Sequence, residues 1–370
     1  MIEEVLSYYR KLGLDPGYQG YFEQKYCGAF SEFQGGGFAD AVATGTAALF
    51  VALAALDLPH GSEVLVSPIT DPGTLSAVIL NGLKPRLMDS LPDSFNIGPS
   101  QFEAAITAQC RAAVIVHAAG RAVEMPGIME VAGRHGIRVL EDCSQAHGAA
   151  WDNRAVGTFG DIAAFSTMYR KAHITGASGG VVYTRNQDLY HAALAHADRG
   201  KPSWRDDFDD RNPNQYLFPA LNLHSDEISC AIGIQSLARL PETISKRRAF
   251  VRQVAGLIEN RSQICRPYGY RAGDSPFIHP IFVNRDAISC SVTEFALALR
   301  EEGIGLNPHY EYLVVNWPFL KPYLAADTDT PNARNVLDGC FALYLNENYG
   351  EQEAQDIADA IAKVEACYAA

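Results

Sequence analysis

The strongest constraint on the fold is an alternating pattern between residue 46 and about residue 185. Short runs of β-branched and other apolar residues alternate there with stretches that have the periodicity of amphipathic helices. This pattern is typical of a parallel sheet whose strands are joined by helices on its faces. It predicts strands at Glu63–Ser67, Pro85–Met88, Ala112–His117, Ile137–Glu141, Ile162–Ser166 and Gly180–Tyr183, and helices at Thr46–Leu56, Ser100–Thr107 and Pro126–His135. We therefore expect an α/β fold with a mostly parallel central sheet, right-handed crossovers, and ligand-binding residues directly after the strands.

The chain beyond residue 200 predicts a second, smaller unit. A stretch rich in Asp, Asn, Pro and aromatic residues at 200–219 lacks periodicity and indicates a long loop, either a lid or an interface arm. A long helix from about Ser225 to Asn260 follows, and the remaining elements are expected at Phe277–Val283 (strand), Val292–Glu302 (helix), Phe341–Leu345 (strand) and from Glu351 onward (helix). We divide the chain into residues 1–240, an N-terminal segment and large domain, and residues 241–370, a small C-terminal α/β domain.

Charge and composition exclude several classes of partner. The net charge of −13, from 30 basic and 43 acidic residues, repels nucleic acid, so an anionic substrate would need a local positive pocket. The longest apolar stretch, Ala47 to Leu58, is roughly half as long as a membrane span. The first residues are acidic where a secretory signal is basic, and the eight cysteines form no Cys-x-x-Cys pair. We expect a cytoplasmic protein with reduced thiols, no metal site, and no nucleic-acid or membrane partner.

Three motifs could carry chemistry, and the first is a turn that opens into a helix. In Ala43-Thr44-Gly45-Thr46-Ala47-Ala48-Leu49, a Gly/Thr turn directly precedes a helix-forming run. Free backbone N–H groups at a helix N-terminus, together with a threonine hydroxyl, make a phosphate-binding site. Ordinary helix capping is the alternative interpretation of this turn.

The second motif is Val139-Leu140-Glu141-Asp142-Cys143-Ser144-Gln145-Ala146-His147-Gly148, in which a buried apolar strand ends in acidic residues. An ionised carboxylate placed there needs a cationic partner, because burying an unpaired charge is costly. A pyridinium nitrogen is such a partner, and a neighbouring arginine or a helix cap is the alternative. We interpret Cys143 as a small buried apolar side chain.

The third motif is Phe165-Ser166-Thr167-Met168-Tyr169-Arg170-Lys171, followed by Ile174-Thr175-Gly176-Ala177-Ser178-Gly179-Gly180. A lysine on a loop of small residues after a strand can reach back over the sheet edge, and its amine can condense with an aldehyde cofactor. By itself such a lysine is usually only solvated. Together, the three motifs supply a phosphate site, a partner for a ring nitrogen and an imine-forming lysine, which are the groups that a pyridoxal 5′-phosphate site requires.

The order and spacing of these motifs resemble those of the DegT/DnrJ/EryC1/StrS family of pyridoxal-phosphate-dependent sugar aminotransferases, from about Thr44 to the C-terminal helix. Gly45–Leu49 is similar to the family's Ser-Gly-Thr-Ala-Ala-Leu, and Glu141–Gly148 to its Glu-Asp-Ala-Ala-Gln-Ala-His-Gly. Phe165–Lys171 with Gly179-Gly180 is similar to its lysine loop, and Leu221-Asn222-Leu223-His224 to its Gly-Phe-Asn-Tyr-Arg-Met segment. The resemblance implies the aspartate-aminotransferase-like fold, known as fold type I.

The resemblance also implies roles for individual residues. Lys171 would hold the cofactor as a Schiff base, Asp142 would keep the pyridine nitrogen protonated, and Gln145 would contact the 3′-oxygen of the ring. The phosphate would be bound by Gly45, Thr46, Ala47 and Ser166, and by Asn222 from the other subunit of a homodimer. His309 and Tyr310 would lie near the substrate, although ordinary turn packing explains them as well.

The implied reaction is a transfer of an amino group from a donor, expected to be glutamate, to a keto sugar, expected to be nucleotide-linked, in amino-sugar biosynthesis. Lys171 would shuttle the proton, and pyridoxamine 5′-phosphate would carry the amine between the two half-reactions. A keto-cyclitol acceptor is also compatible. Four basic residues could serve a diphosphate or could simply be solvated: Arg170, Arg199, Lys201 and Arg205.

The chain departs from the family pattern around the cofactor. Asp71 stands where the family has an aromatic residue that stacks on the ring, Ala172-His173 replaces Asn-Leu, and His224 stands where arginine is common. Asp71 therefore joins the candidate substrate residues. A dehydratase of the same family is an alternative, because that branch has histidine in place of the lysine and His173 is close in sequence. A non-catalytic binding or regulatory protein with this fold is the other alternative.

Overall fold

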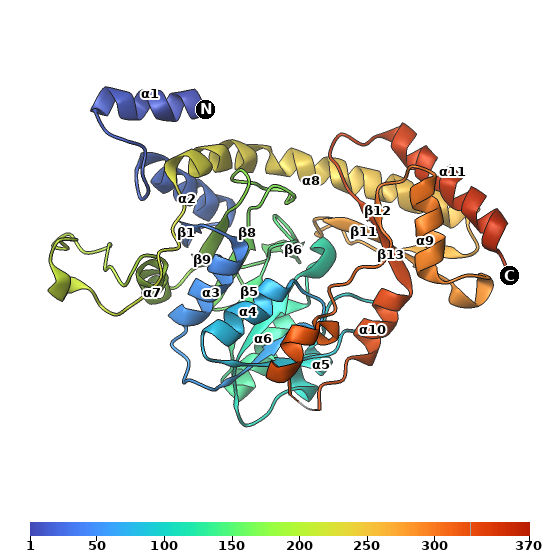
Figure 1. Cartoon of the computed structure of the whole chain (residues 1–370), viewed down its shortest axis with the longest axis horizontal. Helices are drawn as coiled ribbons and strands as arrows, with labels where there is room; N and C mark the ends of the chain where they lie inside the picture. The colour runs from blue at the N-terminus through green and yellow to red at the C-terminus, as the bar shows by residue number, and fades with distance from the viewer. Residues whose placement is uncertain (326) are drawn as a thin grey trace.

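The computed structural model describes residues 1–325 and 327–370, and its largest element is a seven-stranded sheet in the order β1-β9-β8-β5-β4-β2-β3 (Figure 1). The strands span Phe38–Val42 (β1), Glu63–Val66 (β2), Lys84–Leu87 (β3), Cys110–Val116 (β4), Arg138–Asp142 (β5), Ile162–Ser166 (β8) and Gly180–Thr184 (β9). The five strands from β8 to β3 are parallel to their neighbours, which confirms the mostly parallel sheet.

Two strands of this sheet, β1 and β9, run antiparallel to their neighbours. The pattern predicted β9 but not its direction, and it did not predict β1. A parallel connection needs a crossover, usually a helix, and the segment between β8 and β9 contains none. β9 therefore returns beside β8, and the segment that joins them is the loop carrying Lys171.

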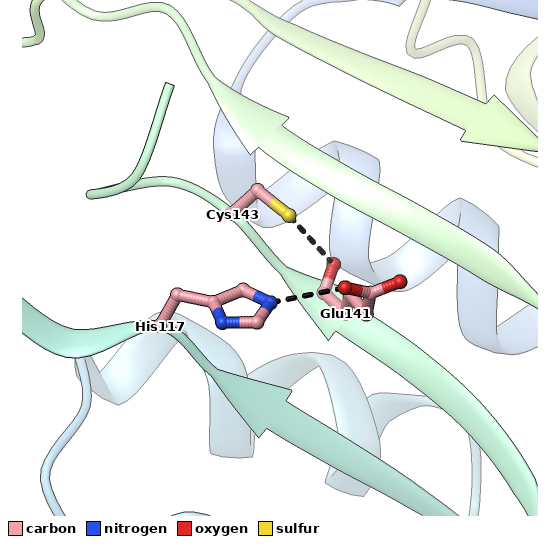
Figure 2. A group of neighbouring side chains, drawn as sticks. All are labelled: His117, Glu141 and Cys143. Carbon is pink, nitrogen blue, oxygen red and sulfur yellow. Dashed lines mark hydrogen bonds and ion pairs between the residues drawn. The ribbon is translucent and has the colours of Figure 1, made fainter. Parts of the chain in front are cut away.

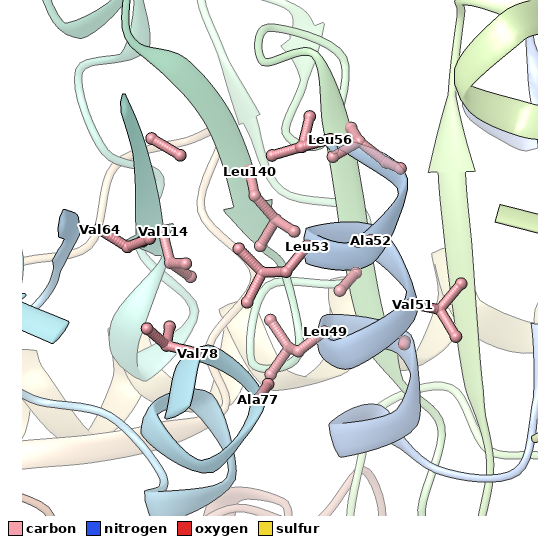
Figure 3. Close-up of a cluster of buried hydrophobic side chains, with 14 of the residues drawn as sticks. Leu49, Val51, Ala52, Leu53, Leu56, Val64, Ala77, Val78, Val114 and Leu140 are labelled. Carbon is pink, nitrogen blue, oxygen red and sulfur yellow. The ribbon is translucent and has the colours of Figure 1, made fainter. Parts of the chain in front are cut away.

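Helices cover both faces of the sheet. One face packs against α3 (Gly45–Ala55), α4 (Pro72–Leu80) and α7 (Gln187–Ala197), and the other against α2 (Tyr21–Phe33), α5 (Pro99–Ala104), α6 (Met125–His135) and part of α8 (Glu227–Arg261). Figure 3 shows Leu49 and Leu53 of α3 against Val64, Val114 and Leu140 of the strands. Successive strand residues point to opposite faces, and both faces are covered, which explains why the strands read as nearly continuous apolar runs.

A smaller antiparallel sheet lies in the C-terminal part of the chain, in the order β10-β11-β13-β12. Its strands are Cys265–Pro267 (β10), Ile278–Val283 (β11), Leu306–Asn307 (β12) and Cys340–Tyr344 (β13), and its helices are α9 (Val292–Glu301), α10 (Pro331–Asp338) and α11 (Glu351–Tyr368). The helix α8 runs along the top of Figure 1 from the first sheet to the second. The division at residues 240 and 241 falls within α8 and stays a prediction.

The remaining elements are small or peripheral. The helix α1 (Ile2–Leu12) lies at the edge of the molecule above α2, and a short hairpin of β6 (Ala150–Trp151) and β7 (Arg154–Ala155) follows β5 (Figure 1). Residues 200–222 protrude beside α7, and three backbone hydrogen bonds tie the base of this loop to the end of α7 and the residues after it: Arg199 N to Leu221 O, Leu223 N to Ala197 O and Leu217 N to Gly200 O. Within the described residues, every helix is too short or too polar to traverse a bilayer.

Candidate active site

A cavity of about 1070 Å³ opens at the carboxyl ends of β5 and β8, between the large sheet and the C-terminal unit. Eight of the residues singled out from the sequence line it: Gly45, Thr46, Asp71, Asp142, Gln145, Ser166, Lys171 and Tyr310. The cavity therefore brings together side chains from α3, α4, β5, β8 and the C-terminal unit. Its position at the strand ends is the one expected for a sheet of this kind.

The N-terminus of α3 forms one end of the cavity. The Thr44 side chain accepts a hydrogen bond from Ala47 N at 2.8 Å, so this threonine caps the helix. Gly45 lies against the end of β8, where a Cβ atom would come within 2.5 Å of the Ser166 Cβ. Only glycine lets α3 begin this close to β8, and the exposed Thr46 faces the cavity beside it. A helix N-terminus with a hydroxyl on each side is chemically suited to a phosphate.

Asp142, at the end of β5, is almost fully buried and lines the cavity. Its carboxylate accepts hydrogen bonds from Ser144 N at 3.0 Å and from the Thr74 hydroxyl at 3.2 Å. Thr74 is in turn hydrogen-bonded to Thr70, at 2.7 Å between the two hydroxyl oxygens. Among the described residues, no lysine, arginine or histidine forms an ion pair with Asp142, although this carboxylate is close enough to Lys171 to act on the pKa of its amine.

The adjacent Glu141 points to the opposite face of β5 and belongs to a separate buried cluster with His117 and Cys143 (Figure 2). Its Oε1 accepts from Phe159 N and Gly160 N, both at 2.7 Å, and its Oε2 accepts from Gly157 N at 2.8 Å and from His117 at 3.1 Å.

The other ring nitrogen of His117, Nδ1, accepts from Val123 N at 3.0 Å, so Nε2 carries the proton that is donated to Glu141. The Cys143 thiol donates to the main-chain oxygen of Glu141 and is buried, which raises the pKa of the thiol well above its ordinary value. The cluster could offer three ligand atoms to a metal, but hydrogen bonds already use its carboxylate and both ring nitrogens. Its observed role is to anchor the loop after the β6–β7 hairpin.

Gln145 is held from both sides. Its Oε1 accepts from Ala119 N at 2.7 Å, and its Nε2 donates to the Tyr310 hydroxyl at 3.0 Å. Ala119 has a positive φ of 58° and belongs to a turn against which the segment before β11 docks, through Ser275 N and Phe277 N. The amide of Gln145 therefore has a fixed orientation, and Tyr310 connects it to the C-terminal unit.

Lys171 projects into the cavity from the loop between β8 and β9, and its Nζ lies 4.6 Å from the centre of the Phe277 ring. Burial lowers the pKa of the Lys171 amine, whereas the nearby Asp142 and Asp71 raise it. The net lowering favours the neutral amine, which is the form that reacts with a carbonyl and accepts a proton. Gly179 closes the loop with φ of 156°, where a Cβ would lie 1.9 Å from the Thr175 hydroxyl oxygen.

Two histidines lie behind this loop. His173 is fully buried, with Nε2 2.6 Å from the Tyr26 hydroxyl and Nδ1 3.2 Å from the Ser236 hydroxyl, and it does not line the cavity. His147 donates from Nε2 to the Ser166 carbonyl at 2.8 Å, and burial lowers its pKa to about 4. Burial also lowers the pKa of His173 well below the ordinary value. Both side chains support the lysine loop from within the core.

Asp71 has a structural explanation that the sequence did not reveal. It is the N-cap of α4, a helix absent from the elements predicted, and its Oδ1 accepts from Gly73 N at 2.8 Å. Pro72 follows at the first helical position, where a missing N–H costs nothing. The side chain also lines the cavity, so it places a carboxylate close to Lys171.

Three of the candidate residues do not line this cavity. Ala47 is packed in the core of α3 and contributes its N–H to the Thr44 cap. Asn222 is exposed at the base of the protruding loop. His309 is half-buried near Asp338 and Glu311, with nitrogen-to-oxygen distances of 3.6 and 3.9 Å. The roles given to these residues stay predictions.

The four basic residues considered for a diphosphate are dispersed. Arg170 lines the cavity, but Arg199 and Lys201 pair with the buried Asp198, and Arg205 pairs with Asp207 on the surface. The structure shows other cavity residues that the sequence reasoning missed, including Arg239, Lys246 and Arg247 of α8 and the aromatic Phe277 and Tyr312. The regular helical spacing of the α8 residues was visible in the sequence, but charged residues at that spacing usually indicate a solvated helix face.

The cavity fits pyridoxal phosphate by its chemistry. The open start of α3 is suited to the phosphate, and the Asp142 carboxylate, which lacks a cationic protein partner among the described residues, is suited to a protonated ring nitrogen. Lys171 is suited to the aldehyde, because its amine is shifted toward the neutral form. All three open into the same space.

Comparison with known proteins gives a consistent result. The model of the DegT/DnrJ/EryC1/StrS aminotransferase family matches residues 14–362. The chain is 27% identical to the spore coat polysaccharide biosynthesis protein SpsC of Bacillus subtilis, over 91% of this chain and 88% of that protein. It is 35% identical to the GDP-perosamine synthase of Caulobacter vibrioides, over 60% of this chain and 58% of that protein.

A solved aminotransferase from Psychrobacter cryohalolentis is similar along nearly the whole chain, with a TM-score of 0.89, 25% identity, and coverage of 99% of this chain and 96% of that one. The fold is therefore that of the type I pyridoxal-phosphate enzymes, as the motifs predicted. The cavity chemistry and the sequence similarity agree on both cofactor and reaction class. The chain belongs to the DegT/DnrJ/EryC1/StrS aminotransferase family and is a pyridoxal-phosphate-dependent sugar aminotransferase.

Proposed function

We propose that this protein transfers the amino group of glutamate to the carbonyl carbon of a nucleotide-linked keto sugar in the synthesis of an amino sugar. The observation that carries the proposal is the convergence of Lys171, Asp142 and the start of α3 on one cavity. The similarity to a GDP-perosamine synthase and to a spore coat polysaccharide protein supports a sugar acceptor and a glycan as the destination.

The residues of this chain divide the work as follows. Bound pyridoxal phosphate supplies a carbonyl that exchanges amines and a ring that accepts electrons. Lys171 would be the amine that binds the cofactor and the base that moves a proton, and its lowered pKa favours both roles. Asp142 would keep a proton on the ring nitrogen. Gln145, whose amide is fixed by Ala119 N and the Tyr310 hydroxyl, would contact the 3′-oxygen of the ring.

The phosphate is assigned to the N-terminus of α3 and to Ser166, with Gly45 allowing the close approach of the two elements. The positive end of the helix dipole and the unpaired N–H groups of its first turn favour a dianion there. Asp71 and Tyr310 lie in the same cavity and are the candidate substrate contacts.

A homodimer with shared active sites is part of this proposal. Asn222, which the family resemblance places at the cofactor phosphate of a partner subunit, is exposed and lies outside the cavity of its own chain. The neighbouring Leu217 and Leu221 expose about half of their apolar surface on the same protruding loop. This loop is exposed and partly apolar, and it carries Asn222, a candidate phosphate-binding residue. These properties are consistent with its insertion into a second copy of the chain.

The cytoplasm is the proposed compartment. All eight cysteines are unpaired, and five of them are buried. Free thiols persist in a reducing compartment, and oxidising compartments favour disulfides. This supports, at the level of redox chemistry, the compartment expected from the sequence.

The two alternatives drawn from the sequence are less well supported. A dehydratase would need a histidine in place of the catalytic lysine, whereas Lys171 occupies the cavity and His173 is enclosed by Tyr26 and Ser236. A non-catalytic protein is less well supported because Lys171, Asp142 and the start of α3 line one cavity, and because the chain is similar along nearly its whole length to a solved aminotransferase.

The test is an absorbance spectrum of the purified protein with pyridoxal phosphate, before and after addition of glutamate. A visible band that shifts on adding glutamate, with formation of the corresponding keto acid, is the expected result. Lys171→Ala should remove the band, and Lys84→Ala, on the exposed side of β3, is the matched control that should keep it. A wild-type protein without such a band would contradict the proposal.

A further inference from the structure

The cavity has a second chemical feature on the side formed by α8. Six residues of this helix face the cavity at helical spacing: Ser236, Arg239, Glu242, Thr243, Lys246 and Arg247. Ser236 begins the row next to the lysine loop, because its hydroxyl accepts from Ile174 N at 2.9 Å. The row therefore starts beside Lys171 and extends outward along α8.

Arg247 is the most unusual member of the row. It is 94% buried, as its exposed fraction is 6%, and it lines the cavity. Its Nη2 donates to Glu347 at 3.1 Å, whereas its buried Nε has no hydrogen-bond partner among the described residues. Glu347 is thus the one hydrogen-bond partner of this guanidinium among the described residues. A guanidinium has five N–H donors, so the donors that face the cavity are available to an anion.

The other charged residues of the row do not neutralise this side of the cavity, which we call the α8 wall. Lys246 pairs with Glu242 at 2.8 Å, but both side chains are largely exposed, and such pairs contribute little. Arg239 is exposed beside them and forms no ion pair within residues 1–325 and 327–370. When Glu347, which also lines the cavity, is counted with the six α8 residues, this side holds three basic residues against two acidic ones in a protein of net charge −13. This is the local positive pocket that an anionic substrate would require.

We propose that Arg247, assisted by Arg239 and Lys246, forms an anion subsite that binds a phosphate or carboxylate group of a substrate while its reacting end lies at Lys171. The proposal rests on the proposed function, since it concerns a second part of the same cavity. A guanidinium offers paired donors to the two oxygens of a carboxylate or phosphate, a geometry that an ammonium cannot match. The group can come from two sources, the diphosphate of the sugar acceptor or a carboxylate of the amino donor.

The experiment measures binding of two probes to the protein loaded with pyridoxal phosphate, by calorimetry. Inorganic pyrophosphate represents the acceptor, and glutarate, which has no amine to react, represents the donor. Loading with the cofactor keeps pyrophosphate away from the start of α3. We expect Arg247→Gln to weaken the binding of one probe by ten- to a hundredfold. This range corresponds to the loss of one charged hydrogen bond, because 1.4 kcal/mol equals a tenfold change in affinity. The weakened probe identifies the source.

Two further variants guard against a misfolded protein. Arg239→Gln removes an exposed charge from the same wall without disturbing the core and should weaken the same probe several-fold. Arg252→Gln removes an exposed charge from α8 outside the cavity and should leave both affinities unchanged. The visible spectrum of each variant reports separately whether the cofactor site is intact.

The outcomes are distinguishable. A wild-type protein that binds neither probe, or equal affinities for wild type, Arg247→Gln and Arg239→Gln, would refute the subsite even if the aminotransferase reaction is found. A missing visible band in the wild type would contradict the proposed function instead. The probes can then be measured on the protein without cofactor, where Thr46→Val serves to separate binding at α3 from binding at α8.

Discussion

The adjacent carboxylates of β5 allow a sharp test, because the structure gives them opposite roles. Glu141 accepts four hydrogen bonds in the core, two at each oxygen, while Asp142 accepts two and faces the cavity. In Glu141→Gln, an amide NH₂ group replaces one of the two carboxylate oxygens. Whichever oxygen is replaced, the NH₂ group faces two buried N–H donors that lose their acceptor. Each donor left unsatisfied costs about 1–3 kcal/mol, so we expect the free energy of unfolding to fall by about 2–6 kcal/mol.

Asp142→Asn should behave differently. Its remaining oxygen can still accept from Ser144 N, and its amide can donate to the Thr74 hydroxyl, so we expect a stability change of less than about 1 kcal/mol. The charge that would hold a protonated ring nitrogen is lost, so the visible cofactor band should weaken or shift. Glu141→Gln should retain that band wherever it remains folded.

The assay is urea unfolding followed by far-UV circular dichroism, with the cofactor spectrum recorded on the same samples. Total stabilities of proteins are about 5–15 kcal/mol, so a loss at Glu141 of the expected size moves the midpoint clearly. If Asp142→Asn were the more destabilised variant, or if folded Glu141→Gln lost the cofactor band, the division of roles on β5 would be wrong.

Three further predictions follow from buried or crowded groups. Burial lowers the pKa of His147 to about 4 and that of His279 to about 3, whereas an unfolded histidine titrates near 6.5. The contribution of each histidine to the free energy of unfolding should therefore be complete above pH 6.5. As the pH falls from about 6.5 toward the two lowered pKa values, the free energy of unfolding should drop by up to about 1.4 kcal/mol per pH unit for each histidine. His279→Leu should remove one of these contributions, and an unchanged pH slope of the melting temperature in that variant would contradict the assignment. Gly45→Ala should push α3 away from Ser166 and weaken cofactor binding at least tenfold in a spectral titration, with unaltered affinity counting against the close approach. Asp71→Ala should lower stability by about 1 kcal/mol and Asp71→Ser should restore most of it, since serine also caps helices, and equal melting of all three proteins would exclude the cap.

Much of the fold was predictable because the apolar pattern repeats over many residues. The strand β8 lies at the predicted residues, and β2, β3, β4 and β5 lie within one or two residues of prediction. The helix α4 was not predicted, because Asp71-Pro72-Gly73 has the composition of a turn. Asp and Pro are also common at the first positions of a helix, and that is their role here. The direction of β9 was not predictable either, because the pattern of a buried strand is the same for both directions.

The candidate site shows the same division between sequence and tertiary structure. The sequence by itself determined the chemistry, because a lysine loop, an acidic strand end and a Gly/Thr helix start are local motifs whose donors and acceptors lie within a few residues of one another. The sequence also selected Asp142 over Glu141, because Asp142 directly follows the predicted strand. Only the tertiary structure decided that Glu141 accepts four hydrogen bonds in the core, that His173 is enclosed away from the cavity, and that the basic face of α8 lines the cavity instead of facing solvent. The physical reason is that exposure depends on what packs against a face, and for these residues the packing partners are far away in the chain.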